Sequence, residues 1–279
     1  MSEKTYPSIN DLTLEEKASL TSGGDAWHLQ GVEAKGIPGY MITDGPHGLR
    51  KQESDSDALG LGRSVPATCF PTASALANSW DETLLSAVGR ALGEEAVAQG
   101  VGMVLGPGVN IKRSPLCGRN FEYFSEDPLL SGKLAAAMIR GIQSTGVSAC
   151  VKHFAANSQE LRRMASDSVL DERTLREIYL TGFEIVVKES APKTIMSSYN
   201  LVNGTYANEN AHLLQDILRR DWGFTGAVVT DWGGSNDHAL GVKNGSTLEM
   251  PAPGGDAVRE LLAAVKSGKI TEADVDARL

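Results

Sequence analysis

The chain has 279 residues, of which 41% are hydrophobic and 22% are charged, an ordinary composition for a globular protein with a large buried core. Its formal net charge of -9 argues against a nucleic acid or an anionic membrane as partner, because both favour a basic surface. No apolar run approaches the ~20 residues of a membrane span, and the N-terminus, MSEKTYPSIN, lacks the apolar core of a signal peptide.

Short apolar runs alternate with amphipathic segments along the chain, as in a β/α series. In chain order we expect a helix at 14–20, strands at 40–43 and 72–77, a helix at 81–99, a strand at 101–105, a helix at 128–143, a strand at 147–151, a helix at 171–188, a strand at 194–198, a helix at 212–221, strands at 227–230 and 248–250, and a helix at 256–267. Thr13 and Glu16 predict a capping box at the first helix. We expect loops at 51–63 and 113–128, and loops of this length are usually functional.

Polar side chains stand where several of these strands end, namely Asp44, Lys152, Tyr199 and Asp231. In a (β/α)8 barrel of the TIM type, all carboxyl ends of the strands open onto one face, which holds the active site. We therefore expect such a barrel, complete or irregular, with these residues together at its mouth. An open doubly wound sheet would also gather its strand ends. No Gly-x-Gly-x-x-Gly follows the first strand, so nothing favours a nucleotide-binding version of that sheet.

The segment AVVTDWGG (227–234) delivers a carboxylate and then an indole at a strand end. Asp231 could attack an anomeric carbon, because the oxocarbenium-like transition state of glycoside hydrolysis favours a carboxylate nucleophile. Trp232 offers a flat face to a sugar ring. Alternatively, Asp231 only caps the next turn and Trp232 packs in the core, and this segment alone leaves both interpretations open.

Three further segments carry candidate sugar contacts. Asp44 could accept two hydroxyl hydrogen bonds or only stabilise the turn that follows it. In the 113–128 loop, Arg119 could face a sugar with Glu122 in support, or the loop charges could pair among themselves. Lys152 and His153 supply donors at a strand end, although a structural role for His153 is equally compatible with the sequence. No metal-ligand spacing is present, and we expect neither a metal nor a cofactor.

Together these segments resemble glycoside hydrolase family 3. The matching pieces occur in the family's order and cover almost the whole chain: TDGPHGLR (43–50), GRNFEYFSEDP (118–128), VKHFAAN (151–157), DERTLREIYL (171–180), IMSSYNLVNG (195–204) and WGFTGAVVTDWGG (222–234). The resemblance implies an N-terminal barrel domain and retaining hydrolysis of β-glucosides, with Asp231 as the nucleophile. It implies sugar contacts from Asp44, Arg119, Lys152, His153, Arg163 and Tyr199, and a lining role for Met196 and Trp232.

Retaining hydrolysis needs a second carboxyl group about 5 Å from the nucleophile, to protonate the leaving oxygen and later to activate water. Lys152 and Arg119 are expected to keep Asp231 ionised. In β-glucosidases of the family, the acid/base Glu usually comes from a second α/β domain after the barrel. We therefore expect residues 1–279 to form the catalytic barrel alone, with that C-terminal domain as its partner. Residues 270–279, with Thr271 as N-cap, have the pattern of a helix that ought to continue.

Two alternatives stay open beside a β-glucosidase barrel. One is a non-catalytic sugar-binding barrel, and the other is a complete single-domain glycosidase with Glu122 or Glu160 as its acid. The single-domain β-N-acetylhexosaminidases of the family carry Lys-His-Phe-Pro-Gly-His-Gly and then Asp-x-His, whereas this chain reads KHFAANS (152–158), with no histidine before His212. Cys69, Cys117 and Cys150, odd in number and far apart, are expected to be free thiols of a cytoplasmic protein.

Overall fold

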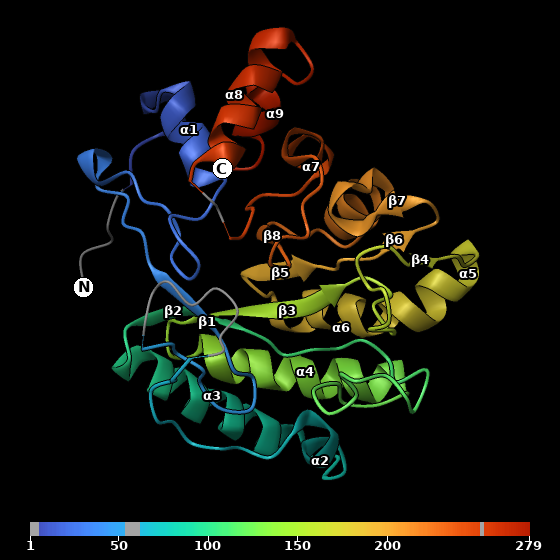
Figure 1. The fold of residues 1–279 in the computed structure, drawn as a ribbon. Coiled ribbons are helices and arrows are strands. Elements are labelled where there is room, and N and C mark those ends of the chain that lie inside the picture. Colours follow the sequence, from blue (N-terminus) through green and yellow to red (C-terminus); the bar gives the residue numbers. More distant parts are fainter. Residues whose placement is uncertain (1–5, 54–61, 252–253) are drawn as a thin grey trace.

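The computed structural model describes residues 6–53, 62–251 and 254–279. Five parallel strands form a curled sheet in which each strand pairs with the next (Figure 1). In order across the sheet they are β1 (Met41–Asp44), β2 (Val101–Leu105), β3 (Ser148–Phe154), β5 (Thr194–Ser197) and β8 (Ala227–Thr230). Because all five run in the same direction, their carboxyl ends lie at one face of the sheet.

Short irregular segments complete the ring between β8 and β1. The segment 248–249 lies beside β8, where Leu248 pairs with Val229. The segment 21–24 pairs with 248–249 on its other side. The segment 27–29 then pairs with both 21–24 and β1. The joining backbone hydrogen bonds run from Thr230 to Leu248 (2.9 Å), from Glu249 to Thr21 (2.9 Å), from Gly24 to His28 (2.8 Å) and from Ile42 to Trp27 (2.8 Å). The fold is therefore an irregular barrel of the (β/α)8 type, with five regular strands and three short closing segments, as the sequence predicted.

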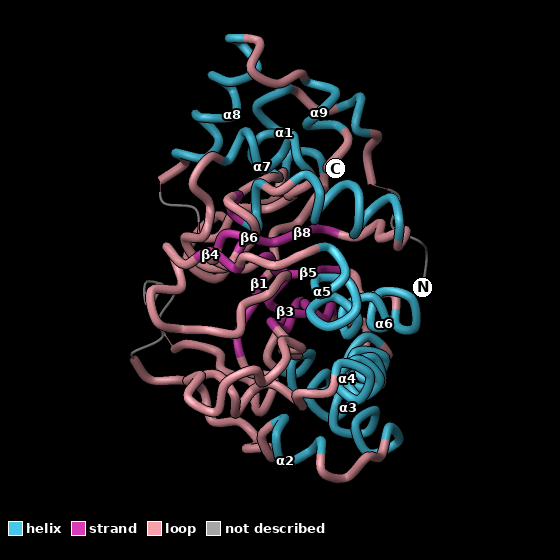
Figure 2. Tube along the Cα trace, turned by 90° about the vertical axis from the view of Figure 1, so that its right-hand side faces the viewer, coloured by secondary structure: helices cyan, strands magenta, loops and turns pink. Residues whose placement is uncertain are grey.

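Helices cover two parts of the barrel (Figure 1, Figure 2). On one side α3 (Glu82–Ala98), α4 (Pro128–Gln143) and α6 (Thr181–Ser190) pack against the sheet, and Asp81 and Asp127 cap the first two. At the opposite end α1 (Leu14–Leu20), α7 (His238–Asn244), α8 (Asp256–Ser267) and α9 (Glu272–Asp276) share a second hydrophobic cluster. The remaining elements are short or irregular: α2 (Ala73–Ala77), α5 (Glu172–Thr174), the π-helical segments Leu175–Leu180 and His212–Asp221, the 3-10 turns Ile9–Asp11, Glu33–Lys35 and Ala207–Glu209, and a small sheet of β4 (Asp167–Ser168), β6 (Leu201–Val202) and β7 (Thr205–Tyr206).

Most predicted elements are confirmed, and the capping box at Thr13 and Glu16 is present. The strand predicted at 72–77 is wrong, because Thr72 accepts the Ala75 N–H and caps α2. The strand predicted at 248–250 is reduced to two isolated bridges, from Leu248 to Val229 and from Glu249 to Ser22. Of the loop predicted at 51–63, residues 54–61 lie outside the described part of the chain. Among the described residues, no helix is both long and apolar enough to cross a membrane.

Candidate active site

The four polar strand ends lie at the same face of the barrel. Asp44 is the last residue of β1, and Lys152 lies near the end of β3. Tyr199 follows β5 by two residues, and Asp231 follows β8 directly. The ammonium of Lys152 donates to Asp44 Oδ1 at 3.3 Å, so residues 108 positions apart are in direct contact.

A cavity of about 460 Å³ opens at this face. Its charged lining includes Asp44, Arg119, Glu122, Lys152, Glu160 and Arg163. The turn after β1 forms one wall and depends on Gly45, whose φ of +119° suits glycine, since a Cβ there would lie 2.1 Å from the Gly48 carbonyl oxygen. A small polar cavity with converging donors and acceptors fits a neutral, hydroxyl-rich ligand.

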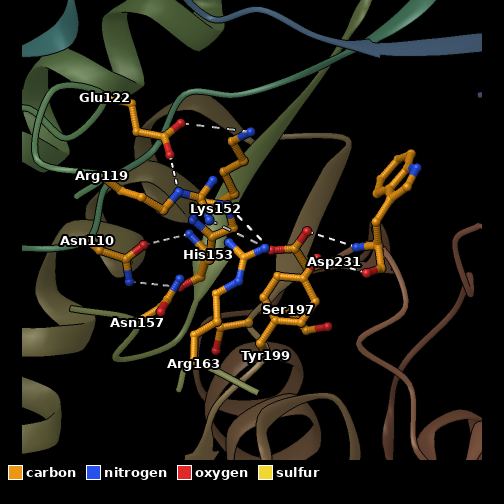
Figure 3. Close-up of polar contacts among 12 residues, drawn as sticks. Asn110, Arg119, Glu122, Lys152, His153, Asn157, Arg163, Ser197, Tyr199 and Asp231 are labelled. Carbon is orange, nitrogen blue, oxygen red and sulfur yellow. Dashed lines mark hydrogen bonds and ion pairs between the residues drawn. The ribbon is translucent and has the colours of Figure 1, made fainter. Parts of the chain in front are cut away.

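Asp231 is not itself a lining residue of this cavity, but it lies next to the lining residue Arg119. Its Oδ1 accepts the Trp232 N–H at 2.8 Å. Its Oδ2 lies 3.9 Å from Arg119 Nη1 and 3.7 Å from His153 Nε2, yet it accepts no hydrogen bond from any described residue (Figure 3). The residue is only 9% exposed. One oxygen is therefore anchored, and the other is held between two nitrogen groups without a short contact.

Burial raises the pKa of the Asp231 carboxyl above its ordinary value, while Arg119, Lys152 and the Trp232 N–H lower it. The sequence predicted that Lys152 and Arg119 would favour the ionised form, and both act in that direction. Burial outweighs them, because a carboxylate removed from water loses more hydration than these cations replace. The ionised form of Asp231 is therefore less stable here than in water, and the positive charge of a cationic transition state would stabilise it.

Glu122 joins the two cations beside Asp231. It is buried, accepts a hydrogen bond from Arg119 Nε, and lies 4.0 Å from Lys152 Nζ (Figure 3). Burial lowers the pKa of the Lys152 ammonium, but the carboxylates of Asp44 and Glu122 outweigh burial and hold that pKa above its ordinary value. Arg119 and Lys152 are thus kept cationic and fixed in place.

His153 is fully buried and uncharged. Burial holds its pKa well below the ordinary value, and the charges of Arg119, Lys152 and Arg163 act in the same direction. Its Nδ1 lies 3.1 Å from the Tyr123 hydroxyl, which can donate to it. We assign the ring proton to Nε2, because this nitrogen faces the Asp231 carboxylate. His153 then presents a neutral donor at the site.

Tyr199 and Trp232 lie beside Asp231 and are held in place by further contacts. The Tyr199 hydroxyl donates to the Trp232 carbonyl oxygen at 2.8 Å, and the Arg163 guanidinium stacks 4.3 Å above the Tyr199 ring. Burial and the Asp231 carboxylate raise the pKa of Tyr199, so it remains a hydrogen-bond donor. The Trp232 indole packs against Trp27 with ring centroids 5.3 Å apart. Met196 lies in the buried core cluster and is not a lining residue of the cavity.

Glu160 is a further carboxylate of the cavity. Its Oε1 lies 4.0 Å from Arg119 Nη1, and its Oε2 accepts from Arg163 at 2.9 Å. Asp231 is 3.9 Å from the same Arg119 nitrogen, so the two carboxylates are near neighbours. Both oxygens of Glu160 therefore lie beside arginines. Among the described residues, no three His, Cys, Asp or Glu side chains are grouped to hold a metal ion.

Sequence reasoning missed Asn110, Tyr123 and Asn157. Asn110 contacts the main chain of His153, and Tyr123 contacts the ring of the same histidine. Asn157 lies beside Glu160. Asn110 comes shortly after β2, so the rule of polar residues at strand ends could have found it. The intervening Gly106, Pro107 and Gly108 directed attention to the turn instead.

The model of the glycosyl hydrolase family 3 N-terminal domain matches residues 55–279. The chain belongs to glycoside hydrolase family 3. It is 57% identical over 264 residues to thermostable beta-glucosidase B of Acetivibrio thermocellus, covering 95% of this chain and 35% of that protein. It is 55% identical over 277 residues to the exo-alpha-(1->6)-L-arabinopyranosidase of Bifidobacterium breve, covering 99% of this chain and 36% of that protein.

Solved structures of the family agree with this fold. The GH3 beta-glucosidase of Bifidobacterium adolescentis superposes with a TM-score of 0.92 at 52% identity, covering 98% of this chain and 39% of that one. A Thermotoga neapolitana beta-glucosidase in complex with glucose gives a TM-score of 0.90 at 42% identity, covering 96% and 41%. The chain thus spans 35% to 41% of the length of these relatives.

Proposed function

We propose that this chain is the nucleophile-bearing domain of a retaining β-glucosidase. The observation that carries the proposal is Asp231, whose Oδ2 is buried without a hydrogen-bond partner among the described residues, between His153 and Arg119, the arginine that lines the polar cavity. An unsatisfied buried carboxylate oxygen costs stability, and its place between two nitrogen groups at a strand end favours a role in chemistry.

The reaction follows from this geometry. Asp231 Oδ2 attacks the anomeric carbon, the bond to the leaving oxygen breaks, and a covalent glycosyl-enzyme forms; water then releases the sugar. Asp44 and Lys152 bind sugar hydroxyls as acceptor and donor, and His153 Nε2 donates a neutral hydrogen bond. The positive charge that develops on the sugar offsets the unfavourable burial of the Asp231 carboxylate.

We propose that the general acid and base comes from a C-terminal α/β domain of the same protein, since relatives are roughly three times as long as this chain. Four exposed apolar side chains beside the cavity would receive that domain. We call Leu116, Phe121, Leu161 and Val169 the apolar rim; Leu116, Leu161 and Val169 are 91%, 74% and 79% exposed. Phe121 lines the cavity itself, and Leu116 and Leu161 line one adjoining hollow. Val169 lines the next hollow, which shares Arg113 and Gln159 with that one. A further domain docked here would bury the apolar rim.

The decisive experiment is covalent trapping. The isolated chain is incubated with 2-deoxy-2-fluoro-β-D-glucosyl fluoride, whose leaving group needs little protonation, so a missing acid matters little. We expect a mass increase of one fluoroglucosyl group, mapped to Asp231 by peptide mass spectrometry and absent in Asp231→Asn. Labelling at another carboxylate, Glu160 for instance, would overturn the assignment.

Other outcomes select the alternatives. A folded chain that is never labelled indicates a non-catalytic sugar-binding barrel. Rapid turnover of an unactivated disaccharide indicates a complete single-domain glycosidase with an acid within this chain.

A second substrate is favoured by the 55% identity to an arabinopyranosidase over nearly the whole chain. An α-L-arabinopyranoside lacks the hydroxymethyl group of a β-D-glucoside and differs from it at C4. We propose the glucoside as the better substrate, supported by the relative at 57% identity. The comparison of burst amplitudes with the two 2,4-dinitrophenyl glycosides tests this choice.

We also propose that the protein works in the reducing cytoplasm. Its odd number of cysteines supports this location, since Cys69, Cys117 and Cys150 are unpaired. Fractionation of source cells with an antibody to this chain would test the location.

A further inference from the structure

We infer that Asn110 is a positioning residue that sets the distance between His153 and Asp231; this inference rests on the proposed function of Asp231. It begins with the main chain of β3. Lys152 is fully paired there, because its N–H donates to the Pro107 carbonyl oxygen at 3.0 Å and its carbonyl oxygen accepts from Val109 N–H at 2.7 Å. On the other side, the pairing of β3 with β5 shifts register between Val151 and Phe154.

His153 lies where both ladders are interrupted, and the side chain of Asn110 replaces the missing strand. Asn110 Oδ1 accepts the His153 N–H at 2.7 Å, and Asn110 Nδ2 donates to the His153 carbonyl oxygen at 2.9 Å (Figure 3). Asn110 is 2% exposed, so both bonds are made away from bulk solvent. An amide is suited to this task, because it presents one donor and one acceptor in a planar fork, like a peptide group.

The two hydrogen bonds from Asn110, here called the main-chain clamp, matter because they orient the His153 ring toward Asp231. Tyr123 holds Nδ1, and Nε2 points at Asp231 Oδ2 from 3.7 Å with no hydrogen-bond partner among the residues described. Two unsatisfied buried polar atoms that face each other imply that their separation is imposed by the surroundings. The main-chain clamp and the Tyr123 hydroxyl are the contacts that impose it on the histidine side. Asn110 thereby acts through His153 and does not touch substrate.

The test measures position first, independently of catalysis. Histidine labelled with 15N in the whole chain gives the His153 Nε2 resonance, assigned with His153→Ala. We expect Asp231→Asn to shift that resonance in the parent chain and to leave it nearly unmoved in an Asn110→Ala background. The matched control is Asn208→Ala, since Asn208 is equally buried but bonds Ser197 and Ser246 instead. In the Asn208→Ala background, Asp231→Asn should still shift the His153 Nε2 resonance.

A second measurement follows labelling by the fluoroglucosyl fluoride. Asn110→Ala should lower the rate constant at saturating reagent about 100-fold, the cost of misplacing a reacting group by about 1 Å, with little change in the half-saturating concentration. In a His153→Ala background the same substitution should add almost nothing, because the two residues act as one unit.

The outcomes separate two failures. An intact resonance response in folded Asn110→Ala, or an undiminished effect of Asn110→Ala without His153, overturns the positioning role. A parent chain that is never labelled overturns the proposed function, while the resonance response still decides the role of Asn110. If Asn110→Ala does not fold, Asn110→Gln, which keeps both amide atoms but displaces them, is measured in the same way.

Discussion

The Asp231 carboxyl makes a stability prediction of its own at the scale of single residues. Its pKa is raised in the fold, so the native state holds the proton more tightly than the unfolded chain, and stability falls as the pH rises through that pKa. Asp231→Asn removes this cost, and we expect it to melt at a higher temperature than the parent chain at pH 7. The difference should vanish at pH values below the ordinary pKa of aspartate. Melting curves of both proteins across this pH range provide the check, and a lower melting temperature for Asp231→Asn at pH 7 would contradict it.

Glu122 gives a second residue-scale prediction, in the opposite direction. It is buried between Arg119 and Lys152, and Glu122→Gln leaves two cations with one carboxylate fewer. Charged hydrogen bonds of this kind contribute roughly 2 kcal/mol, so urea unfolding should show a loss of about that size. Glu184→Gln is the control, because its ion pair with Lys188 lies at the surface and contributes little. Equal effects of the two substitutions would show that Glu122 is not specially placed.

Sequence patterns located residues at the site better than they located their partners. Asp44, Lys152 and Asp231 follow apolar runs, and parallel strands gather their ends, so proximity could be expected from the sequence. The pairing of Glu122 with Arg119 is also among the expectations, but its approach to Lys152 is not, because that depends on how the 113–128 loop folds back over β3. Asn110 and Tyr123 carry no periodic signal, since their partner is a main chain or a ring brought close only by the tertiary fold.

At the scale of elements, the packing of α3 against α4 depends on two glycines. A Cβ on Gly89 would lie 2.1 Å from the Met138 carbonyl oxygen, and one on Gly141 would lie 2.1 Å from that of Ser86. Alanine in a helix normally gains about 1 kcal/mol over glycine, but pushing two helices apart costs ~1–3 kcal/mol. We expect Gly89→Ala and Gly141→Ala to lower the free energy of unfolding. Gly182→Ala in α6, whose Cβ would meet nothing closer than 3.4 Å, should be neutral or stabilising. Urea titrations of the three variants decide, and equal effects would refute the close approach.

Periodicity predicted the longer elements well and the short ones poorly. The helix at 128–143 has a proline at its start, an aspartate before it and a continuous apolar face, so local and tertiary preferences agree. The segment at 72–77 alternates small residues and reads as a strand, yet alanines favour a helix once Thr72 caps it. Two-residue strands such as β4, β6 and β7 have no pattern to detect, because only pairing with one another defines them.

For the whole molecule, the closure of the barrel shows where local sequence information ends. The segments at 21–24 and 27–29 join β1 to residues 248–249, more than 200 positions away, through only one or two backbone hydrogen bonds at each junction. No alternation of polar and apolar residues accompanies pairing over so few residues. The fold class could therefore be predicted from five strands and their helices, while the way the ring closes could not.

The apolar rim yields the prediction that concerns the molecule as a whole. If a further domain covers Leu116, Leu161 and Val169 in the parent protein, the isolated chain leaves them in water, and we expect it to self-associate. Replacing the three by serine should restore a monomer in analytical ultracentrifugation without lowering the melting temperature, because exposed side chains contribute little to the core. Val97→Ser with Leu129→Ser, exposed apolar residues on α3 and α4, should not. If the isolated, unsubstituted chain sediments as a monomer at high concentration, this counts against a docking surface, because an uncovered apolar interface is expected to self-associate.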